Sequence, residues 1–241
     1  SNVMSSELIE IAELVTSWSN SDEQVEAVVT SDRETEVRAY EGEIESLTVA
    51  ESQGIGVRVI KDGRQGFAYA GTLEENELLE VLSEARDNAS FASPDEFSGL
   101  AEHDGVKSVS LEVYSDGVNS LSTSKKIDYA LELEKLTLST DKRISGIESS
   151  EYTDVVSESA IATSTGIRSS SKESGCCLMV YALAEENNET QTGFGFSIGR
   201  TPEDLDIAKA AFDASDRATR MLGSTKPKSE RLTVVLDPWV S

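Results

Sequence analysis

Short apolar runs and helically spaced apolar residues succeed one another along this chain in an order that occurs twice. Apolar residues at helical spacing from Leu8 to Val15 predict a first helix from about Ser6 to Trp18. Comparable spacing predicts helices over 74–89 and 125–138, and a last one after Thr201. Strands are predicted over 24–31, 34–40, 44–52, 55–60 and 67–70, and then over 144–151, 154–163, 167–174, 175–184 and 189–198.

The clearest local signal is a β-hairpin followed at once by a helix. Apolar runs at 55–60 and 67–70 flank Asp62-Gly63, a dipeptide that favours a two-residue hairpin turn. Thr72 and Glu75 then have the spacing of a capping box, which predicts that the helix begins there. Glu41-Gly42 predicts another turn, and the imperfect alternation of the strand that follows it predicts a bulge or a shifted register.

Gly54 and Gly56 resemble a phosphate-binding loop only superficially. In such a loop a helix follows the glycines, whereas here a strand does, so we favour a role in backbone conformation and close strand packing. Arg58 alternates with Val57 and Val59, which places it on the opposite face of the sheet, where it could pair with a carboxylate.

The repeated order of helix, strands and helix predicts an α+β fold with an internal duplication. Gly193-Phe194-Gly195-Phe196 echoes Gly66-Phe67-Ala68-Tyr69, and Thr201-Pro202-Glu203-Asp204 predicts the start of the final helix. The apolar face of that helix is predicted to carry Leu205, Ala208, Phe212, Ser215 and Leu222.

We expect a mixed, mainly antiparallel sheet backed by helices. The 62–63 hairpin should lie beside strands of the second unit, and an edge strand should remain free to add an extended segment. The domain is predicted to span residues 3–222. Residues 223–241 are predicted to be a linker and the start of a further, C-terminal domain, because the apolar run Leu232–Leu236 suggests a chain cut near a domain boundary.

Charge narrows the possible partners. The 241 residues include 45 acidic and 21 basic ones, a net charge of -24, so we expect no direct binding of nucleic acid. The acidic surface favours solubility, and mimicry of DNA in a basic groove remains an alternative that no motif supports. No apolar stretch is long enough for a membrane span and no signal peptide is evident, so the expected location is the cytoplasm.

Candidate catalytic chemistry is sparse. The adjacent Cys176 and Cys177 point to opposite faces of a strand, so they are unsuited to a zinc site or an ordinary disulfide, and core packing is favoured. The only histidine, His103, lies in a predicted loop over 91–122 that contains one short strand at 109–113. We therefore assign no catalytic, cofactor-binding or metal-binding residue to this chain.

Three segments together resemble the TldD/PmbA family, whose members are often named modulators of DNA gyrase and include a metal-dependent peptidase. They are the motif from Gly54 to Ala70, the strand and turn from Ala160 to Gly166, and the alanine-rich stretch from Ala208 to Ala218. The resemblance covers the chain as an N-terminal half. Val235-Leu236-Asp237-Pro238 is similar to the PmbA (TldE) branch, which lacks the zinc motif and pairs with a catalytic subunit.

The resemblance implies a non-catalytic N-terminal domain of a metallopeptidase complex. Its implied role is to shape a peptide chamber with a related TldD-type subunit, or with a second copy of itself, and to help present unfolded peptide. The alternative is an acidic, non-enzymatic binding module that modulates a regulator or DNA gyrase by occlusion. A stand-alone hydrolase ranks third, because the chain has no Gly-x-Ser-x-Gly motif and only His103 as a base.

Overall fold

The computed structural model describes residues 5–102, 105 and 114–225, and its core element is one six-stranded sheet in the order β3-β2-β1-β4-β5-β6. Every neighbouring pair of strands is antiparallel. The strands are β1 (Gln24–Tyr40), β2 (Glu43–Lys61), β3 (Arg64–Ala70), β4 (Ile144–Thr163), β5 (Arg168–Glu186) and β6 (Glu189–Gly199). The helices are α1 (Ser5–Ser17), α2 (Glu75–Phe91), α3 (Gly117–Ser120), α4 (Thr123–Ser139) and α5 (Ile207–Arg220), with a 3-10 turn η1 (Pro202–Asp204).

The internal duplication is visible in the topology. The first unit runs α1-β1-β2-β3-α2 and the second runs α4-β4-β5-β6-α5, and the two units join through the pairing of β1 with β4. The expectation that the 62–63 hairpin lies beside the second unit was therefore wrong. The first strand of each unit, β1 or β4, lies at the centre of the sheet. The β2-β3 hairpin therefore forms the edge that is farthest from the second unit.

Four of the strands are longer than the sequence predicted. The pairs 24–31 with 34–40, 44–52 with 55–60, 144–151 with 154–163, and 167–174 with 175–184 each form one continuous strand. The central parts of β1 and β2 contain exposed polar residues such as Glu34 and Glu51. Where both faces of a strand are exposed to solvent, apolar and polar residues need not alternate. The loss of alternation therefore predicted strand ends at positions where the strands continue.

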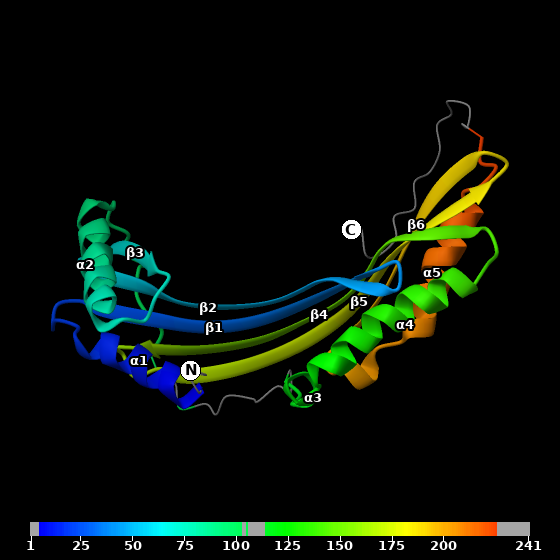
Figure 1. Cartoon of the computed structure of the whole chain (residues 1–241). Helices are drawn as coiled ribbons and strands as arrows, with labels where there is room; N and C mark the ends of the chain where they lie inside the picture. Colours follow the sequence, from blue (N-terminus) through cyan, green and yellow to red (C-terminus); the bar gives the residue numbers. More distant parts are fainter. Residues whose placement is uncertain (1–4, 103–104, 106–113, 226–241) are drawn as a thin grey trace.

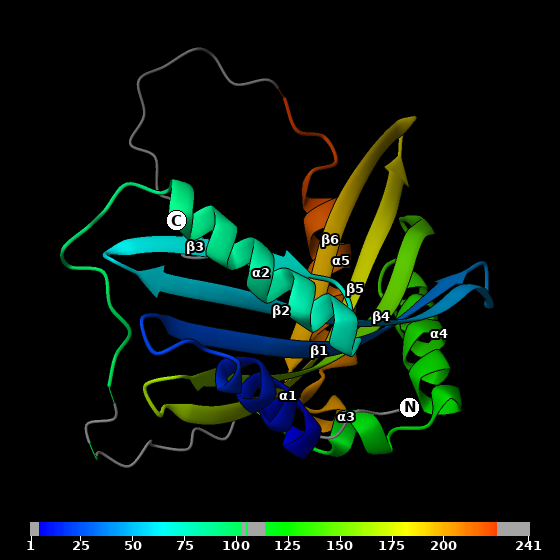
Figure 2. The same ribbon diagram turned by 90° about the vertical axis from the view of Figure 1, so that its left-hand side faces the viewer.

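The sheet is bent into an arch whose outer side carries the helices (Figure 1). Two separate apolar cores lie on this side. The first core joins α1 and α2 to residues that include Val25, Val57 and Ala160, and the second joins α4 and α5 to residues that include Val37 and Leu178. Figure 2 looks at the sheet from the end that carries α1 and α2. Each central strand thus contributes to both cores, with β1 supplying Val25 and Val37.

The outer helices approach the edge strands closely because small residues meet at the contact. A Cβ atom added to Gly66 on β3 would lie closer than 3.0 Å to the backbone of Ala85 and Ala89 on α2. The same holds on β6, where Cβ atoms on Gly193 and Gly195 would meet the backbone of α5 at the alanines at 210, 214 and 218. The predicted echo between the two Gly-Phe segments therefore marks equivalent positions in the two units.

Both predicted helix starts were displaced. Thr72 does not cap α2, whose N-cap is Glu74, although the Glu74 amide donates to Thr72 Oγ1 at 3.3 Å. Thr201 is the N-cap of the 3-10 turn η1, not of α5. Helix α5 begins at Ile207, and its N-cap is Asp206, whose side chain accepts a hydrogen bond from the backbone amide of Lys209. Part of the predicted loop over 91–122 is also helical, since Gly117–Ser120 form the short helix α3.

The predicted face of α5 was confirmed only in part: Ser215 is buried, and Leu205 and Leu222 pack against the second core. Phe212 is 64% exposed and Ala208 is exposed, whereas the buried residues are Ala210, Ala211, Ala214, Ser215 and Ala218. A phenylalanine cannot fit against Gly193 and Gly195, so the alanine stripe faces the sheet instead.

The turn predictions were confirmed. Asp62 and Gly63 have φ values of 52° and 70°, and Glu41 and Gly42 have values of 52° and 80°, all in the left-handed region that tight hairpin turns require. The bulge expected after Glu41-Gly42 is a register shift between Arg38 and Ala39 in the pairing of β1 with β2.

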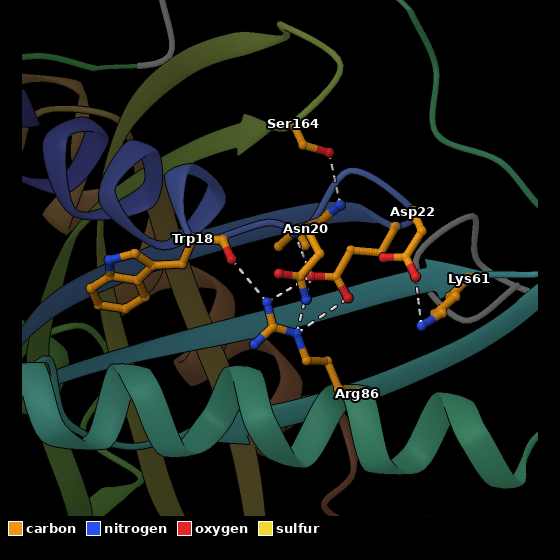
Figure 3. A network of polar contacts seen from close by, with 8 residues as sticks. Trp18, Asn20, Asp22, Lys61, Arg86 and Ser164 are labelled. Atoms are coloured by element: carbon orange, nitrogen blue, oxygen red, sulfur yellow. Dashed lines mark hydrogen bonds and ion pairs between the residues drawn. The ribbon is translucent and has the colours of Figure 1, made fainter.

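A polar network fixes the α1-β1 connection to α2 (Figure 3). Arg86 donates to the Glu23 carboxylate at 2.6 Å and to the Trp18 carbonyl at 2.9 Å, and Glu23 also accepts from the Asn20 amide. The Glu23 side chain is only 2% exposed, so its carboxylate is shielded from solvent and depends on Arg86. The ion pair therefore attaches the α1-β1 connection to α2.

Candidate functional site: the helix-free face of the sheet

The sheet has a covered face, packed by α1, α2, α4 and α5, and an open face on its other side. In the described part of the chain no helix covers the open face. Strand alternation places Arg58 on β2, Phe67 on β3, Tyr181 on β5 and Phe194 on β6 on the open face. Among the described residues, the open face is therefore a side-chain surface that no helix packs against.

One end of the open face carries the aromatic residues of β3. Phe67 is 59% exposed and Tyr69 is 63% exposed. The Tyr69 ring occupies the space where a Cβ on Gly54 would lie, and the Phe67 ring is 3.1 Å from the corresponding point on Gly56. The predicted role of these glycines in close packing between strands is confirmed, since the Phe67 and Tyr69 rings pack directly against the glycine backbone.

Arg58 lies beside this aromatic pair and is neutralised by its neighbour. Its guanidinium donates to both carboxylate oxygens of Glu26 on β1, at 3.1 and 3.0 Å. The expected ion pair is confirmed. The two parallel hydrogen bonds hold the Arg58 guanidinium and the Glu26 carboxylate in one orientation at this end of the open face.

The opposite end of the open face carries a second aromatic cluster. The rings of Tyr181 and Phe194 lie 4.7 Å apart between centroids, and Phe194 stacks on Phe196 at 5.6 Å. Ile198, next along β6, is 64% exposed. Contiguous exposed aromatic and aliphatic side chains on a folded domain are typical of contact surfaces.

Acidic and hydroxyl side chains separate the two aromatic ends. On β1 the open face carries Asp32, Glu34 and Glu36, and paired β4 positions include Ser157 and Thr153. The Arg38 guanidinium, also on this face, lies 2.6 Å from the Glu151 carboxylate. The open face therefore combines apolar ends with an acidic centre, a pattern suited to a basic or mixed polypeptide partner.

The outer edges of the sheet are the second feature suited to binding. β3 and β6 are the terminal strands, and among the described residues no further strand pairs with them. Their unpaired backbone groups could accept an added strand, as expected from the sequence.

A cluster of buried titratable groups lies on the covered face, around the ion pair of Lys126 and Asp154. The Lys126 ammonium lies 2.6 Å from the Asp154 carboxylate, which also accepts from the Tyr152 hydroxyl at 2.8 Å. Burial, with a further contribution from Asp154, raises the pKa of Tyr152. Burial likewise raises the pKa of the nearby Cys176 thiol to about 12, which disfavours the thiolate form.

The two cysteines divide as the alternation predicted. Cys176 is buried on the covered face, Cys177 is half-buried on the open face, and both are free thiols. Burial raises the pKa of Cys177 as well. Packing rather than reactivity explains the pair.

A catalytic metal centre has no candidate in the described residues. No group of three or more His, Cys, Asp or Glu side chains there could hold a metal ion, and no helix there is long and apolar enough to cross a membrane. His103, the predicted strand at 109–113 and the run Leu232–Leu236 all lie outside the described residues.

The sequence contains a signal for the open face. In Gly66-Phe67-Ala68-Tyr69 and in its echo at 193–196, small residues alternate with aromatic ones. Small residues facing a helix force their aromatic neighbours to the other side of the strand. That inference would have located both aromatic ends.

Family models match both units of the fold. A PmbA/TldA metallopeptidase domain 1 matches residues 25–89, and a PmbA/TldA metallopeptidase central domain matches residues 116–222. Metalloprotease PmbA of Escherichia coli O157:H7 is 23% identical over 212 residues, which cover 87% of this chain and 46% of that protein. A metalloprotease PmbA homolog of Buchnera aphidicola is 28% identical over 175 residues, covering 68% of this chain and 37% of the relative.

Solved structures share the fold. A Thermotoga maritima protein named as a candidate modulator of a DNA gyrase has a TM-score of 0.77 at 23% identity, over 92% of this chain and 50% of the other. TldE from Thermococcus kodakarensis has a TM-score of 0.70 at 19% identity, over 88% of this chain and 47% of the other. The chain thus spans about half the length of the relatives that it matches, and it belongs to the PmbA/TldD metallopeptidase family as a PmbA/TldE-like member.

Proposed function

We propose that this chain is a non-catalytic N-terminal part of a PmbA/TldD-type metallopeptidase complex. In this proposal residues 3–222 act as one α+β unit that shapes a peptide chamber and contacts a related, zinc-containing subunit. The single observation that carries the proposal is the open face, because both units of a metallopeptidase-family fold leave the same side of the sheet without helices.

The chemistry of the open face supports a polypeptide partner. Aromatic side chains at both ends supply apolar contact area, and the acidic centre favours a partner that contributes basic or hydrogen-bonding groups. The sheet is curved, and the open face lies on its concave side (Figure 1). A concave face with two edge strands that pair with no further strand in the described residues suits extended, unfolded peptide as well as a subunit.

The direct test is co-expression of the complete gene product with a tagged family member that carries a zinc motif and comes from the same genome. We expect the two to copurify, and the mixture to cleave an unfolded peptide in a chelator-sensitive manner, whereas this chain alone does not cleave it. Substituting Phe67→Ser and Ile198→Ser together should reduce copurification, because both side chains are exposed on the open face.

Phe212→Ser is the matched control. Phe212 is 64% exposed, as Ile198 is, but it lies on α5 and not on the open face, so its loss should leave copurification unchanged. A full-length protein that stays monomeric and ignores the zinc-motif homologue would contradict the proposal. That outcome would favour an acidic module that acts by occlusion.

A further inference from the structure

A cavity of about 590 Å³ lies where the turn between β1 and β2 meets α4. The turn contributes Glu41 and Gly42, and α4 contributes Glu134 together with apolar side chains. A Cβ atom added to Gly42 would meet nothing within 4 Å, so the space beside the turn is open. The volume falls in the range of small-ligand sites.

The cavity is lined by one carboxylate that is buried and only half satisfied. Glu134 is 3% exposed. Its Oε1 accepts from the Gly42 amide at 2.7 Å, whereas its buried Oε2 has no hydrogen-bond partner among the described residues. Leaving a buried carboxylate oxygen unpaired is costly, and proteins ordinarily supply a donor.

The surroundings of Glu134 are acidic at the rim and apolar along the walls. Leu131 and Leu138 from α4 line the cavity, and Leu138 is 42% exposed. The Glu41 carboxylate stands at the rim, and its charge raises the pKa of the adjacent Tyr40, with smaller contributions from Glu45 and Glu134. Glu41, Glu134 and Lys135 all line the cavity, so a cation entering from solvent meets two carboxylates and one ammonium group, a lining with net negative charge.

We propose that this cavity is a binding site for a lysine side chain of another polypeptide. The ammonium group would donate to Glu134 Oε2, and the methylene stem would lie against Leu131 and Leu138. The inference concerns binding by this chain alone and does not depend on the proposed function.

The geometry favours an ammonium group over a guanidinium. Because Oε1 is engaged by the Gly42 amide, the carboxylate offers a single oxygen and cannot form the two parallel bonds that an arginine fork prefers. A compact charge on a flexible stem suits one acceptor at the end of an apolar wall. Glu134 Oε2 has less than 1 Å² of accessible surface, so the exposed side chains of Glu41 and Lys135 that border the cavity must change rotamer before an ammonium group can reach it.

The test is titration of the folded protein with Nα-acetyl-lysine N-methylamide, followed by two-dimensional ¹H–¹⁵N NMR. We expect saturable binding at about millimolar affinity, with the Gly42 amide among the most shifted signals. The isosteric norleucine compound, which lacks the ammonium, should not shift Gly42, and the arginine compound should bind more weakly than lysine.

Glu134→Gln keeps an acceptor for the Gly42 amide and removes the charge, so it should weaken lysine binding by about tenfold or more. Glu132→Gln makes the same change at an exposed position on the same helix and should bind as the unaltered protein does. If Glu134→Gln does not fold, Leu138→Ala serves instead and should weaken binding by about threefold. Equal binding of lysine and norleucine compounds, equal binding by Glu134→Gln, or no Gly42 shift at saturation would each overturn the proposal.

Discussion

The two units of this fold have the same order of elements but stabilise their interiors differently. In the first unit the core is aliphatic, with Leu8, Val57 and Leu82 fully buried or nearly so, and its main polar link is the network around Arg86 near the surface. In the second unit polar groups are placed inside. Glu134, Thr137, Ser150, Asp154, Ser174, Ser197 and Ser215 are all buried there.

The difference shows that one topology can be stabilised by two kinds of interior. An aliphatic core tolerates small changes of packing, whereas a buried ionic pair must keep both partners in place. The second unit should therefore be less tolerant of single polar substitutions. The following predictions test this contrast, from the largest expected effect to the smallest.

Removing the cation of the buried pair should have the largest effect. Lys126→Met leaves Asp154 as an uncompensated buried carboxylate, so we expect the free energy of unfolding to fall by about 3 kcal/mol. Urea unfolding followed by circular dichroism measures this. The double variant Lys126→Met with Asp154→Leu should recover part of the loss, and a single variant as stable as the unaltered protein would show that the pair is dispensable.

Filling the helix–sheet contacts should destabilise both units alike. Gly195→Ala in the second unit and Gly66→Ala in the first each place a methyl group against helix backbone, and each should cost about 2 kcal/mol. Gly146→Ala is the control, since its nearest neighbour would be Leu183 Cδ1 at 3.8 Å, and it should cost less than about 0.5 kcal/mol. Hydrogen exchange resolved by peptide should show α2 loosened by the first change and α5 by the second. Loosening of both helices by either change would mean that the units unfold as one.

Breaking the surface-proximal network of the first unit should cost less than breaking the buried pair. Arg86→Met removes the charged partner of Glu23, whose side chain is 2% exposed. Two features limit the cost: the arginine position is 33% exposed, so water can reach the carboxylate once the guanidinium is gone, and the Asn20 backbone amide still donates to it. We expect a loss of about 1 kcal/mol. The control is Arg33→Met, whose bridge to Glu51 joins side chains that are 50% and 59% exposed, and which should cost almost nothing. If Arg86→Met costs as much as Lys126→Met, the contrast between the units does not hold.

The smallest effect concerns two carboxylates at equivalent helix-to-strand connections. Hydrogen bonds from the Arg143 side chain lower the pKa of Asp141 to about 2, and a side-chain hydrogen bond from Lys61 lowers the pKa of Asp22. Because the folded pKa lies below the ordinary value of 3.8, the stabilisation by Asp141 is present above about pH 4 and is lost as the pH falls through 2. Arg143→Gln should raise the pKa of Asp141 in an NMR titration and leave Asp22 unchanged. A shift at both residues would indicate long-range coupling.

Local chemistry made part of the fold predictable from sequence. Asp62-Gly63 and Glu41-Gly42 demand left-handed backbone, so the hairpins followed from residue type alone. The buried face of α5 could not be predicted from sequence. Phe212 is exposed because α5 packs closely against glycines on β6, and this proximity exists only in the folded structure. The pairing of β1 with β4 was invisible for the same reason.

The candidate site was predictable only in its outline. A free sheet edge followed from the number and type of strands, and the pairing of Arg58 with a carboxylate followed from alternation. The half-satisfied Glu134 could not be found, because helical spacing alone does not reveal that a turn more than ninety residues earlier donates to it.

The pairing of β1 with β4 has a consequence for how the chain acquires this structure. Glu26 pairs with Thr163, and Ala39 pairs with Ser150, so the central ladder joins segments separated by more than a hundred residues. Closing so long a loop costs entropy before any contact offsets it, whereas the β1-β2 and β5-β6 hairpins close locally. We therefore expect each hairpin to form early and the seam between the units to set the overall rate of folding. Substitutions along that seam should slow refolding more than equally destabilising substitutions at the sheet edges.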